Sequence, residues 1–247
     1  MKKRRKLKTW VIILFMILCL IGLIYSCYKI YNWNNDTNEN KKLKDKIDDS
    51  ISVDTKEEIP KYKIDWDTIK EQNSDTIAYL KVNNTNIDYV VVKGKDNSYY
   101  LSHNFNKEYN IAGWVFADYH NKFDGMDKNI IIYGHNTRDN SMFGSLKNIL
   151  EESWYNNEEN YTIDLVTENG LSEYQVFSVY TITREDYYIN TNFSTDDKYM
   201  EFLNTLKERS IKDFDIVLNS KDKILTLSTC ATGGVKRVVL HAKLIDN

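Results

Sequence analysis

Seven segments after residue 79 are rich in β-branched and aromatic residues, and they constrain the fold more than any other feature of the chain. Side chains of these types favour strands. Turn residues at 168–170 predict a tight hairpin between two of the segments. The expected strands are 87–92, 113–118, 129–134, 161–167, 173–182, 223–229 and 237–245.

After residue 60, three segments carry helical signals. Asp65 is a good N-cap for a helix over 66–72. The run 196–209 begins with acidic and ends with basic residues, which suits the helix dipole, and 141–152 is the third. Many strands with few helices predict a mostly β fold, either a closed barrel or a sandwich.

The N-terminal sequence predicts a membrane anchor. Six of the first eight residues are basic, and no residue from Thr9 to Tyr28 is charged. Twenty residues of helix extend about 30 Å, the thickness of the hydrocarbon core of a bilayer. Basic residues before the span and only Lys29 just after it predict a cytoplasmic N-terminus. A cleaved signal peptide is the alternative, but the apolar run is long and no A-x-A-like site follows it.

Composition divides the rest of the chain. Residues 30–60 are polar, and we expect them to form a solvated stalk. Leu43, Ile47 and Ile51 recur at four-residue spacing, so a thin amphipathic helix over part of this segment is the alternative. We therefore expect a basic tail and membrane span in 1–29, the stalk in 30–60, and an extracellular domain in 61–247. The chain after Lys29 carries a formal charge of −10, which argues against nucleic acid as a partner.

Cys230 is the only cysteine after the span, so it has no intramolecular partner in the outer domain. An unpaired cysteine in a secreted domain is either incidental or a reactive thiol. A structural zinc site would need several thiolates or histidines. Cys230 ends an apolar strand and precedes the small residues 231–234, where a thiol is accessible. At neutral pH such a thiol needs a nearby base or cation to act as a nucleophile.

Four histidines could supply that base. His135 follows the apolar segment 129–134, so it lies past a strand end as Cys230 does, and we expect it to be the partner. His103 and His120 lie in polar, loop-like sequence and are expected to be solvated. His241 lies within the last strand.

Arg237 follows Cys230 across a Gly-Gly turn and is the candidate cation. Period-2 alternation assigns Val238 and its even-numbered successors to the core. The other, polar face then carries Arg237, Val239, His241 and Lys243. An arginine is always charged and donates up to five hydrogen bonds, so it can stabilise a thiolate or an oxyanion.

Several of these segments resemble sortases, the membrane-anchored cysteine transpeptidases of Gram-positive bacteria. Three segments show the resemblance: TLSTC (226–230), RVVLHAKL (237–244), which begins with an arginine, and IIIYGHN (130–136). Segments NTNIDYVVVKGKDNSYYLSHNF (84–105) and AGWVFADYHN (112–121), with the helix-bearing insertion at 190–215, resemble class B sortases in particular. The resemblance covers residues 62–245 and is specific in its spacing.

The resemblance implies a closed β-barrel with an N-terminal helical extension and a helix inserted before the cysteine-bearing strand. By position, Cys230 would be the nucleophile, His135 the acid and base, and Arg237 the oxyanion donor. Ser228 and Thr229 would line the substrate pocket.

The implied reaction cleaves an LPxTG- or NPxTx-like C-terminal sorting motif of secreted proteins through a thioester. An amine of a peptidoglycan precursor then accepts the acyl group. We expect no metal or organic cofactor.

Other classes remain open from the residues alone. A cysteine peptidase would release the acyl group to water, although in papain-like enzymes the cysteine precedes the histidine. A non-catalytic binding module on a stalk would not need Cys230, His135 and Arg237 to converge.

Overall fold

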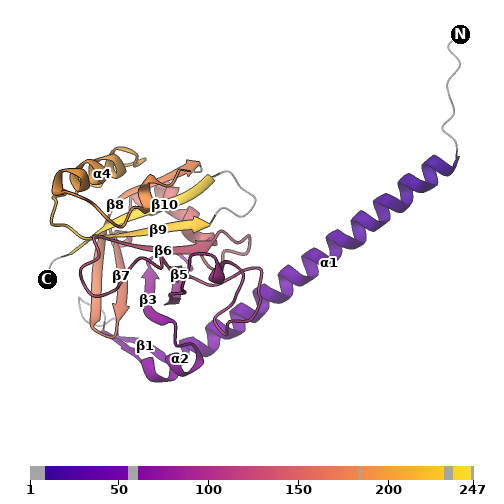
Figure 1. The fold of residues 1–247 in the computed structure, drawn as a ribbon, viewed down its shortest axis with the longest axis horizontal. Coiled ribbons are helices and arrows are strands. Elements are labelled where there is room, and N and C mark those ends of the chain that lie inside the picture. Colours follow the sequence, from indigo (N-terminus) through magenta and orange to yellow (C-terminus); the bar gives the residue numbers. More distant parts are fainter. Residues whose placement is uncertain (1–8, 55–60, 184, 231–235, 246–247) are drawn as a thin grey trace, which may run out of the picture.

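The computed structural model describes residues 9–54, 61–183, 185–230 and 236–245. A long N-terminal helix leads into a barrel, and α4 covers one outer side of it (Figure 1). The helices are α1 (Thr9–Asp48), α2 (Trp66–Gln72), α3 (Glu152–Tyr155) and α4 (Asp196–Glu208). The 3₁₀ helices are η1 (Tyr99–Leu101), η2 (Gly144–Leu150), η3 (Glu158–Asn160) and η4 (Tyr187–Ile189).

Eight strands close the barrel in the order β10-β8-β7-β3-β4-β5-β6-β9. The β4–β5 and β6–β9 pairs are parallel and the others are antiparallel. β1 and β2 form a separate hairpin. The strands are β1 (Ile51–Asp54), β2 (Lys61–Ile64), β3 (Thr76–Val82), β4 (Asp88–Val92), β5 (Phe116–Ala117), β6 (Asn129–His135), β7 (Thr162–Thr167), β8 (Gly170–Thr183), β9 (Ile224–Cys230) and β10 (Lys236–Leu244).

The closed barrel and the helix inserted before β9 are confirmed. Six of the seven expected strands occur with ends within three residues of their predicted positions. The seventh, 113–118, shrinks to Phe116–Ala117. Gly113 has φ +58°, and a Cβ there would lie 2.4 Å from the Tyr100 carbonyl oxygen. The chain turns too tightly at that point to continue as a strand.

Two of the three helices expected after residue 60 are confirmed, and the third differs in type. Asp65 caps α2 as predicted, since its side chain accepts a hydrogen bond from the Thr68 amide, and α4 begins at Asp196 as expected. The segment 141–152 instead forms a tighter 3₁₀ helix, η2. β3 and the β1–β2 hairpin are not among the expected strands.

The expectation of a fully solvated stalk is wrong for its first half. α1 runs without a break through the expected span to Asp48. Asn40 and Ile47 on this helix are both 2% exposed. The Asn40 amide donates to the Gly113 carbonyl at 2.9 Å and to Asn110 Oδ1 at 3.2 Å. The helix therefore docks on the barrel, because its polar residues find specific partners there. Its apolar N-terminal part is long enough to cross a membrane, a property that signal sequences share.

Two hydrophobic cores flank the sheet at β10. Val238 and Leu240 pack in the barrel interior. Val239 belongs to a second core with residues of α4 and β8, and His241 beside it is 0% exposed. The assignment of Val239 and His241 to a polar face is thus wrong, because α4 covers that face (Figure 1).

Burial of His241 predicts acid lability. It lowers the pKa of His241 from its ordinary 6.5 to about 3. At a pH between these two pKa values, the unfolded chain binds a proton at His241 that the folded chain does not. The contribution of His241 to the free energy of unfolding is therefore fully present above pH 6.5 and falls as the pH drops toward 3. The loss from pH 7.5 to pH 5 should be about 2 kcal/mol.

Urea unfolding at the two pH values tests this prediction. His241→Gln keeps one donor and one acceptor but does not ionise, so its stability should fall by about 2 kcal/mol less than that of the parent protein. Other titrating groups are common to both proteins and cancel in the comparison. Equal losses in the two proteins would contradict the prediction.

Candidate active site

His135 and Cys230 lie next to each other at the ends of two adjacent parallel strands. In the β6–β9 register His135 is the Cα partner of Cys230, and each is the last residue of its strand. Neighbouring strands lie roughly 5 Å apart. The topology thus joins two residues 95 positions apart in sequence, as the expected nucleophile and base require.

The His135 imidazole is buried and held in one tautomer. The residue is 7% exposed, and its Nε2 is 2.7 Å from the Leu101 carbonyl oxygen. A carbonyl can only accept, so Nε2 carries the hydrogen and donates it. Nδ1 has no hydrogen-bond partner among the described residues. Burial lowers the pKa of His135, which keeps Nδ1 unprotonated and available as a base.

The backbone around His135 is fixed by close packing. The Phe143 amide donates to the His135 carbonyl oxygen at 2.9 Å. A Cβ on Gly134 would lie 2.6 Å from the Phe143 ring, so a larger residue at 134 would displace this contact. The Phe143 ring therefore fits against β6 directly beside the histidine.

Arg237 lies on β10, near the end of β9. The β9–β10 pairing reaches Val239 and Ser228, and the Val238 amide next to Arg237 still bonds to Oγ1 of Thr229, the residue before Cys230. Arg237 Nη1 donates to Tyr188 Oη at 3.0 Å and to Asp186 Oδ1 at 3.2 Å. Nε and Nη2 of Arg237 have no partner among the described residues. The Asp186 carboxylate is 75% exposed, so this ion pair is weak and easily exchanged.

Ser228 and Thr229 lie directly before Cys230, and each is 1% exposed. Ser228 Oγ lies 2.8 Å from Tyr188 Oη. Thr229 Oγ1 accepts a hydrogen bond from the Val238 amide at 2.9 Å. Their hydroxyls thus secure the end of β9 to η4 and to β10. The residues 231–235 lie outside the described part of the chain.

Tyr188 and Leu101 are the functional contacts that the sequence did not reveal. Tyr188 is 0% exposed, and its hydroxyl touches both Arg237 and Ser228. Leu101 contacts His135 through its backbone carbonyl oxygen. Any residue at position 101 could supply this contact, so the side chain gives no sign of it in the sequence. Two adjacent tyrosines at 187–188 stand out in the sequence. The sequence does not show, however, that the Tyr188 hydroxyl contacts Ser228 on β9 and Arg237 on β10.

The other histidines have partners of their own. His103 stacks on Tyr99, with ring centroids 4.0 Å apart. His120 Nδ1 lies 2.8 Å from Asp118 Oδ1. Neither is a register partner of Cys230 in the pairings of β6, β9 and β10. Among the residues that the structure describes, no group of three His, Cys, Asp or Glu side chains could hold a metal ion.

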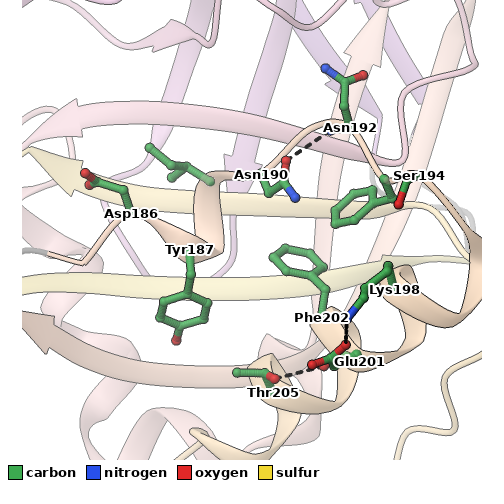
Figure 2. Close-up of a pocket in the computed structure, with 11 residues that line it drawn as sticks. Asp186, Tyr187, Asn190, Asn192, Ser194, Lys198, Glu201, Phe202 and Thr205 are labelled. Atoms are coloured by element: carbon green, nitrogen blue, oxygen red, sulfur yellow. Dashed lines mark hydrogen bonds and ion pairs between the residues drawn. The ribbon is translucent and has the colours of Figure 1, made fainter.

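An open cavity of about 780 Å³, with both polar and apolar lining residues, adjoins this region between the η4 turn and α4 (Figure 2). Asp186 and Tyr187 line it from the turn, while Lys198, Glu201 and Thr205 line it from α4. Asp186 is also the ion-pair partner of Arg237. The cavity therefore begins at the edge of the Arg237 site.

Comparisons with known proteins agree with this geometry. The sortase domain family matches residues 80–245. Sortase B of Staphylococcus aureus is 31% identical over 97% of this chain and 98% of its own length. The crystal structure of Bacillus anthracis sortase B superposes with a TM-score of 0.75 at 32% identity, covering 86% of this chain and 99% of that one.

A substrate complex of Staphylococcus aureus sortase B superposes with a TM-score of 0.69 at 35% identity. It covers 73% of this chain and 84% of that one. These matches extend over both the barrel and the strands that carry His135 and Cys230. The chain therefore belongs to the sortase family, as a cysteine transpeptidase of the sortase B type.

Proposed function

We propose that the protein cleaves an LPxTG- or NPxTx-like sorting motif at the C-terminus of secreted proteins and joins them to an amine of a peptidoglycan precursor. The pairing of His135 with Cys230, with Nδ1 unpartnered, is the observation that carries the proposal. Sortase B has been solved with a substrate and with triglycine, which supports a peptide donor and a glycine-type amine acceptor.

The first half-reaction forms a thioester. The Cys230 thiol gives its proton to His135 Nδ1, and Sγ attacks the carbonyl carbon of the motif threonine. Arg237 donates hydrogen bonds to the oxyanion that develops. The peptide C–N bond then breaks, and His135 returns the proton to the departing amine.

The second half-reaction forms a new amide. The acceptor amine attacks the thioester carbonyl and loses a proton to His135, and Arg237 again stabilises the oxyanion. The C–S bond breaks and the sulfur regains its proton, so the cycle involves no net oxidation. Ser228 and Thr229 are buried, and they support the site by holding the end of β9 through their hydroxyls. No cofactor takes part in these steps.

The location follows from the N-terminal sequence. The uncharged part of α1 acts as a single-pass anchor, with the basic tail in the cytoplasm and the catalytic domain, residues 61–247, outside the cell. The docked second half of α1 then holds the barrel near the outer surface of the membrane.

Mass spectrometry of the full-length chain in detergent micelles tests the proposal. Peptides with LPxTG- and NPxTx-like motifs are incubated with and without triglycine. We expect an acyl-enzyme mass at Cys230 and a triglycine-linked product, and neither with Cys230→Ala. A product released only as the free carboxylate in the presence of triglycine would identify a peptidase. Unchanged cleavage by Cys230→Ala would refute the assignment of the nucleophile.

A further inference from the structure

A fully buried histidine lies behind the active-site strands, outside the catalytic set. His241 of β10 is 0% exposed, and its ring stacks near Phe177, with centroids 5.9 Å apart. Its Nε2 lies 2.9 Å from Tyr180 Oη, and its Nδ1 lies 2.9 Å from Thr226 Oγ1. Both ring nitrogens are thus occupied by neutral hydroxyls.

The hydrogen bonds continue from His241 in both directions. On one side Thr226 Oγ1 donates to Asn129 Oδ1 at 2.7 Å. Asn129 Nδ2 then donates to the carbonyl oxygens of Asn190 at 3.0 Å and Tyr188 at 3.4 Å. On the other side Tyr187 Oη donates to Tyr180 Oη at 3.3 Å.

Only one arrangement of hydrogens satisfies this chain. The two carbonyl contacts fix the Asn129 amide nitrogen as donor, so its oxygen accepts the only hydroxyl hydrogen of Thr226. Thr226 must then accept from Nδ1 of His241, which leaves Nε2 to accept from Tyr180. The chain therefore runs in one direction, from Tyr187 through His241 to Asn129.

Both ends of this chain meet the same turn. It begins at the Tyr187 hydroxyl and ends on the carbonyl oxygens of Tyr188 and Asn190, so it clamps the turn 187–190 against β6, β9 and β10. The same turn carries the Tyr188 hydroxyl, which lies 3.0 Å from Arg237 Nη1 and 2.8 Å from Ser228 Oγ.

We propose that His241 and Asn129 are positioning residues of the transpeptidase, which clamp the turn 187–190 so that Tyr188 holds Arg237 beside Cys230. The inference rests on the proposed role of Arg237 in the reaction. A buried network with all its members satisfied specifies a single geometry, whereas a broken one leaves buried groups unpaired. The clamp sets where Arg237 donates, and neither His241 nor Asn129 touches the reacting atoms.

The first test removes the amide that joins the chain to the turn. Asn129→Ala is compared with Asn160→Ala, a matched control. Asn160 is also buried, and its amide donates to the Trp154 carbonyl at 2.9 Å on a loop before β7. Both changes should lower the unfolding temperature. Only Asn129→Ala should lower kcat, by about tenfold or more, with a smaller change in KM.

The second test distinguishes the hydrogen bonds of His241 from its volume. His241→Phe fills the space without either hydrogen bond and should lower kcat about tenfold. His241→Gln keeps a donor and an acceptor and should retain kcat within about threefold. If Asn129→Ala does not fold, Tyr180→Phe, which removes one hydroxyl of the chain, takes its place and should also lower kcat.

A double-mutant cycle decides whether the effect passes through Tyr188. In a Tyr188→Phe background, Asn129→Ala should reduce kcat by no more than about twofold further, because the hydroxyl that holds Arg237 is already gone. Losses that multiply, or equal kcat values for Asn129→Ala and Asn160→Ala, would overturn the inference.

Failure of the proposed chemistry gives a different result. Cys230 is alkylated in each variant and the modified peptide is identified by mass spectrometry. A functional nucleophile with a displaced Arg237 should retain its alkylation rate within about threefold while kcat falls. If Cys230→Ala keeps its activity, the nucleophile is wrongly assigned, whatever the clamp variants do.

Discussion

His135→Ala should lower kcat for peptide cleavage by about 10²- to 10⁴-fold, the range expected for loss of a general acid and base. The imidazole is fixed by the Leu101 carbonyl, and its free Nδ1 is the group that would exchange protons with Cys230 and with the two amines. Both half-reactions need this exchange. Steady-state cleavage of a sorting-motif peptide by the full-length chain measures the loss.

His120→Ala is the control for this prediction. The His120 side chain is 49% exposed and bonds to Asp118, whose amide donates to the Ile131 carbonyl four residues before the end of β6. Its replacement should change kcat by less than about threefold. The outcome that counts against our assignment is a folded His135→Ala variant with kcat within about tenfold of the parent.

Local sequence patterns were sufficient to predict most of the barrel. Strand segments such as 129–134 and 223–229 are marked by their own composition, and Cys230 and His135 stand out because each follows such a segment. The sequence could suggest that these two ends meet, but the β6–β9 pairing that joins them depends on closure of the whole barrel.

Contacts between distant segments explain what sequence reasoning missed. The polar composition around Asn40 favoured a solvated stalk, yet its side chain bonds to Asn110 and Gly113. The alternation in β10 identifies two faces of a strand, but it cannot show that α4 covers the second. The same limit hid Tyr188, whose hydroxyl reaches two strands far from it in sequence.

Arg237→Ala should lower kcat by about a hundred- to a thousandfold, the usual cost of removing one oxyanion donor. Arg237→Lys should be nearly as damaging. A lysine keeps the charge but loses the planar fork, so it cannot hold Tyr188 with one nitrogen and donate to an oxyanion with another. Both values come from peptide cleavage by the full-length chain.

Two comparisons separate a directional donor from a simple charge. Lys236→Ala removes the neighbouring exposed cation and should change kcat by less than about threefold. If Arg237 only lowers the thiol pKa, Arg237→Lys should recover most of the rate, and alkylation of Cys230 in Arg237→Ala should shift to higher pH. We expect no such recovery, because the Tyr188 hydroxyl holds Nη1 of the guanidinium at 3.0 Å and so sets its direction.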